Sequence, residues 1–304
     1  MGHGFHTPDG HPLTDRPALH AYLLGRVEFD ALLALQRRLA YDVGGDRDGG
    51  AVVVCDHPSG ITVGREGSRA HIRPEPEELT ARGWPVRWVA RGGGVLLHLP
   101  GQVACYPVLP LDRLNLTPAA YLVELQLLVI DLLAEYELRG VPDPLAPGVR
   151  VNGRRVAHVA AAVRGGVTAF GLVLNVDPDL EPFRAVHCDG DPLPMTSLQR
   201  ESTARVRVAA VRQRLVEAVA ARFGVARVSL FHTHPGLAPR PATHASAWLG
   251  GVILSPSEAK ITIGIPIFFR STEHPSPREN VPFSISLPTK SWETTATISS
   301  VEKR

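Results

Sequence analysis

The sequence predicts an α+β fold. Short apolar runs rich in Val and Leu, which are typical of buried strands, alternate along the chain with longer segments whose apolar residues have helical spacing. This alternation indicates strands and helices that share a core. A chain of 304 residues is long enough to bury that core, as one large domain or as one domain with an appendage.

The elements of the first half follow from spacing and turn signals. Residues 1–20 are rich in His, Gly and Pro, and we expect a loose lead-in there. Apolar spacing predicts a helix over 28–40, and the β-branched run 51–55 predicts a buried strand. The other expected elements are a short strand and turn over 61–65, a short helix over 73–82, and strands over 86–90 and 103–109.

The second half carries clearer signals. Leucines at helical spacing, with no proline among them, predict a helix over 119–134. Asn152–Gly153 is a strong two-residue hairpin turn. The other expected elements are a strand over 149–151, a hairpin of 155–163 and 167–176 around Gly165–Gly166, and an amphipathic helix over 206–222 that closes the main domain.

The composition changes near residue 250. All three lysines of the chain, Lys260, Lys290 and Lys303, lie beyond this point, where isoleucine, serine and threonine also become frequent. We therefore divide the chain into the lead-in 1–20, a main domain over 21–235, and a linker with a tail over 236–304, to which no function is assigned.

Composition also excludes several classes of protein. The formal net charge of +2 is too small to indicate nucleic acid or a membrane surface as a partner. We expect neither a secretory signal nor a membrane span, because no apolar stretch has the required length or flanks. The three cysteines have no metal-ligand spacing, and their odd number favours a reducing compartment. We therefore expect a cytoplasmic protein without a metal site.

The stretch from Arg91 to Gln102 is the first candidate site. Three consecutive glycines follow Arg91, and His98 precedes a Pro-Gly turn. Glycine lets a ligand approach the backbone closely, so this loop suits a pocket for an acyl chain or a small acid. A tight hairpin without a ligand is the alternative interpretation.

Cys188 is the candidate nucleophile. It lies in a polar loop between His187 and Asp189, whereas Cys55 and Cys105 lie in apolar strand-like runs and are expected to be buried. A thiol attacks only as thiolate, so Cys188 needs a neighbouring positive charge or a base. The alternative is an unreactive loop thiol.

Five segments, in this order, resemble the motifs of the lipoyl(octanoyl) transferases, LipB, of the biotin and lipoate protein ligase superfamily. The resemblance extends from about Tyr22 to about Phe223. The segments are Asp56–Pro58 with Thr62–Arg65, the loop Arg91–Gln102, Gly153–Ala160, Gly166–Val176, and His187–Asp189 with Met195–Leu198.

The resemblance implies a fold and an activity. The fold would be that of the biotin and lipoate ligases, an α+β arrangement with a central mixed sheet flanked by helices, and 21–235 would be the catalytic domain. The activity would be transfer of an octanoyl group from acyl carrier protein to a lysine of a lipoyl domain, through a thioester on Cys188 and without a cofactor. The acceptors would be lipoyl domains of 2-oxoacid dehydrogenase complexes and the glycine cleavage H protein, with no nucleic acid and no membrane involved.

The resemblance also implies site residues, and the chain departs from the pattern at several of them. Arg155 stands where the family has a catalytic lysine; it can stabilise a thiolate but cannot act as a base, so His158 or His187 would accept the proton. Asp189 replaces a glycine and would raise the pKa of the thiol if it approached Cys188. The amides of Gly92 to Gly94 would either cradle the carbonyl or line the acyl slot. The implied substrate-binding residues are Arg91, Gly92, Gly93, Gly94, Val95, Leu96, Leu97, His98, His158, Val159, Ala160, Gly171, Leu172 and Val173.

Two other functions remain open at this point. An ATP-dependent lipoate or biotin ligase would need a lysine that contacts the acyl-adenylate, and the main domain has no lysine. A non-catalytic protein that binds acyl groups or lipoyl domains would need only the scaffold.

Overall fold

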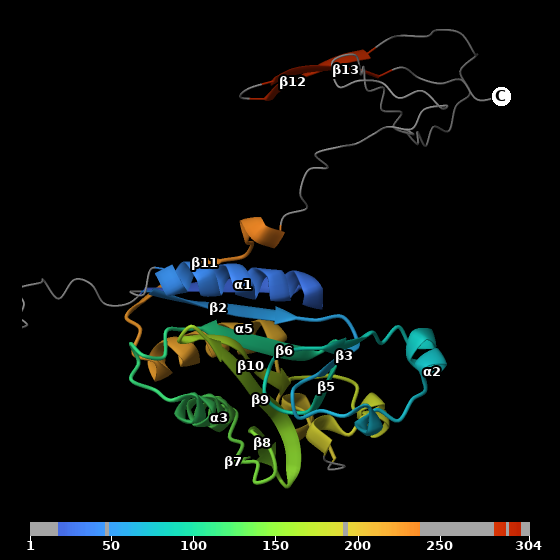
Figure 1. The fold of residues 1–304 in the computed structure, drawn as a ribbon, viewed down its shortest axis with the longest axis vertical. Coiled ribbons are helices and arrows are strands. Elements are labelled where there is room, and N and C mark those ends of the chain that lie inside the picture. The colour runs from blue at the N-terminus through green and yellow to red at the C-terminus, as the bar shows by residue number, and fades with distance from the viewer. Residues whose placement is uncertain (1–17, 46–48, 191–193, 238–282, 290–291, 299–304) are drawn as a thin grey trace, which may run out of the picture. The chain divides into compact units, whose positions relative to one another are not determined.

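The structure is a computed structural model that describes residues 18–45, 49–190, 194–237, 283–289 and 292–298. The chain divides into two compact units, residues 1–238 and 239–304. The first unit contains a large mixed sheet, a small second sheet and the helices (Figure 1). No helix in the described ranges is long and apolar enough to cross a bilayer.

The large sheet has eight strands, in the order β11-β1-β2-β6-β10-β9-β8-β7. β1 pairs in parallel with both of its neighbours, and the other pairs are antiparallel. The strands are β1 (Ala18–Arg26), β2 (Gly49–Asp56), β6 (Gln102–Val108), β7 (Gly140–Pro142), β8 (Gly148–Val151), β9 (Arg154–Arg164), β10 (Val167–Asn175) and β11 (Arg227–Phe231).

Helices cover both faces of this sheet because its central strands are apolar on both faces. Along β2, Val52 and Val54 pack on one side, whereas Val53 and Cys55 pack on the other, as the two-residue period of a strand requires. The first side packs against α3 (Pro118–Ala134) and α5 (Val208–Arg222), and the second against α1 (Phe29–Gly45). Figure 1 shows α1 and α3 on opposite sides of the sheet.

The small sheet has three strands, in the order β4-β3-β5, and it carries the glycine-rich stretch. These are β3 (Gly60–Val63), β4 (Val86–Trp88) and β5 (Val95–His98). Its apolar residues share a third core cluster with short helical segments. The short segments of the unit are η1 (Arg69–His71), α2 (Pro76–Ala81), η2 (Glu181–Ala185), η3 (Cys188–Gly190), α4 (Leu198–Glu201) and η4 (Pro235–Leu237).

Most predicted elements are confirmed, with shifts of a few residues at their ends. Asn152 and Gly153 both have positive φ angles, 51° and 75°, as a two-residue hairpin turn requires. α1 extends five residues beyond the predicted end at residue 40, to Gly45. The two strands in Val149–Val163 and their partner in Val167–Asn175 lie where the turn signals placed them.

Three expectations were wrong, and one strand was not expected. The lead-in does not extend to residue 20, because β1 begins at Ala18. Val95–His98 is not loop: it forms β5, paired with β3. The helix over 206–222 begins at Val208 and does not close the domain, because β11 follows it and adds to the sheet beside β1. The remaining difference is β7, a three-residue edge strand that is too short for a periodic signal.

The second unit is described only over β12 (Phe283–Thr289) and β13 (Trp292–Ile298), which form an antiparallel pair. The linker predicted over 236–241 lies almost wholly outside the described residues, as do residues 1–17 of the predicted lead-in. The predicted division at 235/236 therefore stays a prediction.

Candidate active site

The glycine-rich stretch lies directly against the segment that bears Cys188. The amide N–H of Gly94 donates a hydrogen bond of 2.8 Å to Oδ1 of Asp189. A Cβ atom at position 94 would lie 2.8 Å from the Asp189 Cα, so only glycine allows this approach. The contact joins two segments 95 residues apart in the sequence and fixes η3 beside β5.

The amides of Gly92 to Gly94 do not form the predicted cradle. The Gly92 N–H donates to the Ala161 carbonyl at 2.9 Å, and the Gly93 N–H donates to Glu66 Oε1 at 3.3 Å. With Gly94 bonded to Asp189, all three donors are already used within the protein. The glycines instead let the loop pack against β9 and η3.

Cys188 is buried, which the sequence did not predict. Its side chain packs in the third core cluster with Leu97, Val186 and Met195. Burial is the largest cause that raises the pKa of the thiol, to about 12; Asp189 raises it further, whereas a hydrogen bond with the Leu97 backbone, Arg155 and Arg91 lower it. Cys188 is therefore a protonated thiol at neutral pH in the free protein.

Cys55 and Cys105 are buried, as predicted, but their surroundings differ from those of Cys188. Burial is the largest cause that raises the pKa of each thiol. Two arginines, Arg155 and Arg91, lower the pKa of Cys188, whereas at Cys55 the effect of Arg212 is opposed by Asp56, and among the described residues burial alone shifts the pKa of Cys105. The effect of two arginines thus separates Cys188 from the two strand thiols.

Arg155 is fully buried between two carboxylates. Its Nε donates to Asp143 Oδ2 at 2.7 Å, and its Nη1 donates to Asp189 Oδ2 at 3.1 Å. Asp143, in the loop between β7 and β8, also accepts a hydrogen bond of 2.7 Å from Arg150 Nη2. Asp143 could not be identified from the sequence, because a single aspartate in a proline-rich loop gives no local signal.

His158 lies on β9, three residues after Arg155, and contacts the same carboxylate. Its Nδ1 is 3.0 Å from Asp189 Oδ2. Its Nε2 is buried and has no hydrogen-bond partner among the described residues. Burial lowers the pKa of His158, Arg155 and Arg91 lower it further, and Asp189 opposes them. The imidazole is therefore neutral at pH 7.

Arg91 and His98 meet at Thr62, on the small sheet. Arg91 Nη2 donates to Thr62 Oγ1 at 2.9 Å, and His98 Nε2 lies 3.0 Å from the same oxygen. His57 lies beside them and hydrogen-bonds Tyr106 Oη at 3.0 Å. This buried polar cluster holds the loop from Arg91 to His98 in place.

A small internal cavity brings half of the predicted substrate-binding residues together. Its volume of about 10 Å³ has room for roughly one water molecule. The residues Gly92, Gly93, Gly94, Val95, Leu97, Val159 and Leu172 do not line it. Its lining residues are Phe29, Arg91, Leu96, His98, Tyr106, His158, Ala160, Phe170, Gly171 and Val173.

The predicted residues outside this cavity have other places. Val159 and Leu172 pack on the far side of the sheet, in the core with α3 and α5. Val95 and Leu97 pack around Cys188. Phe170, which the sequence analysis did not select, lines the cavity with a positive φ angle of 61°, a conformation that is strained for a bulky residue.

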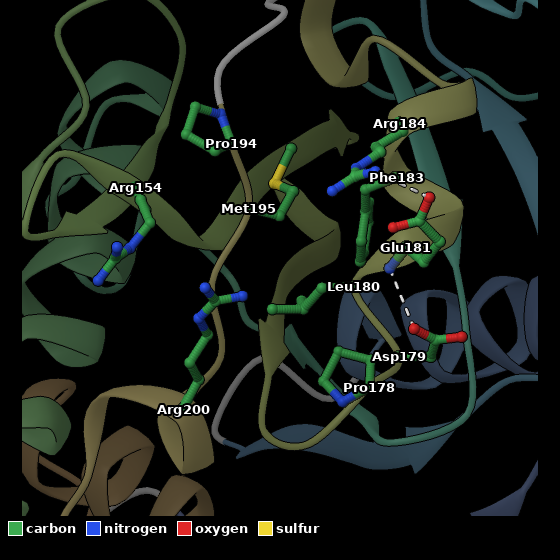
Figure 2. A pocket seen from close by; sticks show the side chains of 10 residues that line it. All are labelled: Arg154, Pro178, Asp179, Leu180, Glu181, Phe183, Arg184, Pro194, Met195 and Arg200. Atoms are coloured by element: carbon green, nitrogen blue, oxygen red, sulfur yellow. Dashed lines mark hydrogen bonds and ion pairs between the residues drawn. The ribbon is translucent and has the colours of Figure 1, made fainter.

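An open cleft lies beside the segment 194–196, whose Pro194 and Met195 line it. Its volume is about 780 Å³ (Figure 2). The segment is bound to Arg155 through the backbone, because the Arg155 N–H donates to the Pro194 carbonyl and the Thr196 N–H to the Arg155 carbonyl. The lining residues are Arg154, Pro178, Asp179, Leu180, Glu181, Phe183, Arg184, Pro194, Met195 and Arg200.

The cleft and Cys188 share part of their apolar wall. Phe183 and Met195 line the cleft and also belong to the cluster that surrounds Cys188. Figure 2 shows these two side chains near each other, with Arg200 and Arg154 on the other side of the cleft. Arg154 is paired with Glu201 at 2.7 Å, and Arg184 with Glu181 at 3.1 Å. Arg200 has no ion pair within the described ranges.

Residues 30–220 match the lipoyl protein ligase A/B catalytic domain, and the chain belongs to this family. Within it, the chain is similar to curated octanoyltransferases. It is 35% identical to that of Chloroflexus aggregans over 215 residues, which cover 69% of this chain and 97% of the relative. It is 39% identical to that of Alkalilimnicola ehrlichii over 181 residues, 60% of this chain and 80% of the relative.

Solved structures confirm the predicted fold. Lipoate-protein ligase A bound with ATP superimposes with a TM-score of 0.56 at 16% identity, covering 73% of this chain and 90% of that protein. The bi-partite lipoate protein ligase of Thermoplasma acidophilum gives a TM-score of 0.50 at 16% identity, covering 70% and 87%. At these identities the likeness establishes the α+β fold of the lipoate ligases alone.

Proposed function

We propose that this protein transfers an octanoyl group from acyl carrier protein to a lysine of lipoyl domains, through a thioester on Cys188. The octanoyltransferase activity follows from the curated relatives, one of which aligns over 97% of its length. The assignment of the chemistry to Cys188 rests on one observation. The hydrogen bond from Gly94 to Asp189 holds the cysteine segment against the glycine-rich stretch, beside Arg155.

The reaction has two half-reactions. The Cys188 sulfur attacks the carbonyl carbon of the octanoyl thioester, a new C–S bond forms, and the carrier leaves as a thiol that has gained the proton of Cys188. The amine of the acceptor lysine then attacks the new thioester, the amide forms, and Cys188 returns to the thiol. Arg155 and Arg91 supply the positive charge that stabilises the thiolate in each half-reaction.

The acyl chain would occupy the internal cavity. Its walls are apolar at Phe29, Leu96, Phe170 and Val173, as an alkyl chain requires. A cavity of about 10 Å³ does not hold eight carbons, so side chains must move when the substrate binds. Phe170 is the best candidate, because its strained backbone conformation gains from a rearrangement.

The open cleft is the side from which the carrier would deliver its acyl group. It borders the cluster around Cys188, and Arg200 presents a charge without an ion pair in the described part of the chain. The thiol-bearing arm of a carrier contains a phosphodiester, and an arginine suits that group. The three buried cysteines are free thiols, in agreement with a reducing cytoplasm as the place of the reaction.

Intact mass spectrometry tests the proposal. The full chain incubated with octanoyl acyl carrier protein, without ATP, should gain one octanoyl group on the peptide that contains Cys188. Hydroxylamine should remove it, and a lipoyl domain added later should receive it on lysine. Cys188→Ala should abolish both half-reactions, whereas Cys55→Ala should leave them intact. A gain that needs ATP would indicate a ligase, and the absence of any gain would indicate a binding protein.

A further inference from the structure

Both half-reactions need a proton acceptor that Arg155 cannot be. The Cys188 thiol must lose a proton before it attacks, and the acceptor amine must lose one as the amide forms. A guanidinium stays protonated at any pH near neutral. Arg155 moreover donates hydrogen bonds to both Asp143 and Asp189.

Most other polar groups near the cavity are already bonded. Asp189 accepts hydrogen bonds from Gly94, Arg155 and His158. The two ring nitrogens of His57 contact the Val27 carbonyl and the Tyr106 hydroxyl, at 2.7 and 3.0 Å. His98 Nε2 contacts the Thr62 hydroxyl.

His158 differs from these groups. It lines the cavity, and its Nε2 is buried without a partner in the part of the chain that the structure describes. An ionised carboxylate only accepts hydrogen bonds, so Nδ1 must carry the hydrogen that lies toward Asp189. The neutral ring then has its lone pair on Nε2, on the side away from Asp189.

We propose that His158 is the proton acceptor of acyl transfer and that Asp189 is its positioning residue. This inference rests on the proposed function. In the first half-reaction Nε2 takes the proton of the Cys188 thiol and gives it to the leaving thiolate of the carrier. In the second it takes a proton from the attacking amine and gives it to the Cys188 thiolate as the C–S bond breaks. No proton is gained or lost over the full cycle.

The charges around His158 agree with this role. Asp189 stabilises the imidazolium that forms during transfer, while Arg155 and Arg91 favour its return to the neutral ring. The other titratable groups in this region are His98 and Tyr106, which line the same cavity, and Cys188, which precedes Asp189 in the chain. The pKa of His158 lies below that of a free histidine, so the ring is ready to accept a proton at neutral pH.

The test compares His158→Gln with a matched control. The control is His71, which lies against Gly190, two residues after Cys188. Its Nδ1 is also buried without a partner among the described residues, but His71 does not line the cavity. In rapid-quench acylation by octanoyl acyl carrier protein, His158→Gln should be about 100-fold slower and should lose the acidic inflection of the pH–rate profile. His71→Gln should keep both the rate and the inflection.

A measurement on the free wild-type protein makes the test independent of the variant's folding. Nitrogen-15 NMR of the histidines should show His158 as the Nδ1–H tautomer, and Asp189→Asn should change that tautomer. An Nε2–H tautomer in the wild type would overturn the inference. So would a His158→Gln protein that is acylated as fast as the control. If the wild type forms no thioester on Cys188, the proposed function fails and the inference fails with it.

Discussion

Two buried arginines, Arg91 and Arg155, both lower the pKa of the Cys188 thiol, and their partners differ in kind. Arg155 lies between the carboxylates of Asp143 and Asp189. Arg91 donates to neutral oxygens, those of Thr62 and Gly92, and no carboxylate forms an ion pair with it in the described ranges. Burial is accordingly the main cause that lowers the pKa of Arg91.

The charge of Arg155 is paired with carboxylates of the fold, whereas the charge of Arg91 is available to the substrate. A buried charge without a partner is costly, so an unpaired arginine persists where something else uses its charge. The charge of Arg155 is shared with two carboxylates before any substrate arrives, so only part of it acts on the Cys188 thiolate. The charge of Arg91, at the cavity wall, remains available for the oxyanion or thiolate that forms during transfer. The two arginines should therefore respond oppositely to the same substitution.

The largest effect is expected on stability at position 155. Arg155→Met leaves two buried carboxylates without their shared partner, and we expect the free energy of unfolding to fall by about 3–5 kcal/mol. Arg91→Met removes a charge that no carboxylate pairs but leaves the buried Thr62 and Gly92 oxygens without their donor, so the loss should be smaller, about 1–2 kcal/mol. Urea unfolding monitored by circular dichroism measures both. Equal losses in the two variants would contradict the comparison.

The second effect is expected on activity at position 91. Arg91→Met should slow acylation of Cys188 by about 100-fold or more while the protein stays folded, because a developing negative charge loses a cation that lines the cavity and has no ion pair among the described residues. Arg91→Lys should recover part of the rate, since it keeps the charge but not the planar set of donors. Single-turnover rates at saturating donor provide the measurement, and an unchanged rate in Arg91→Met would assign Arg91 to the fold alone.

The third effect is on the pH dependence of stability. Burial raises the pKa of Asp189, but interactions with His158, the Gly94 N–H and Arg155 outweigh it and hold that pKa at about 2, below its value in an unfolded chain. A carboxyl whose pKa is lower in the folded protein stabilises it above the unfolded pKa, near 4, and this stabilisation is lost as the pH falls from about 4 to about 2. We expect a loss of about 2 kcal/mol over that range, absent in Asp189→Asn. Unfolding curves at several pH values test it.

The smallest effect concerns Arg200, an exposed arginine in the open cleft. Arg200→Glu should raise the KM for octanoyl acyl carrier protein several-fold, since a surface charge changes encounter more than chemistry. It should leave the KM for a short, uncharged octanoyl thioester unchanged. Arg164→Glu, exposed at the end of β9 and absent from the cleft, is the matched control. Equal effects of the two variants would indicate general charge repulsion.

The sequence by itself determined the framework of the domain. The continuous β-branched run in 51–55 and the leucines at helical spacing in 119–134 placed a strand and a helix, because the pattern of apolar residues records which sides of an element are buried. Asn152–Gly153 fixed a hairpin turn, because few residues adopt positive φ angles easily. The order of the motifs indicated the family and selected Cys188, Arg155 and the glycine-rich stretch as candidate site residues.

Only the tertiary structure decided how these residues are charged and paired. Asp143 lies 12 residues from Arg155, and Asp189 lies 31 from His158 and 95 from Gly94, so their contacts leave no periodic signal. The polar residues on either side of Cys188 in the sequence suggested an exposed loop, but Asp189 pairs with Arg155 and His158, and the thiol lies among apolar side chains. Burial of a charged residue depends on which partners reach it from other elements, and those partners meet only when the sheet and its loops have assembled.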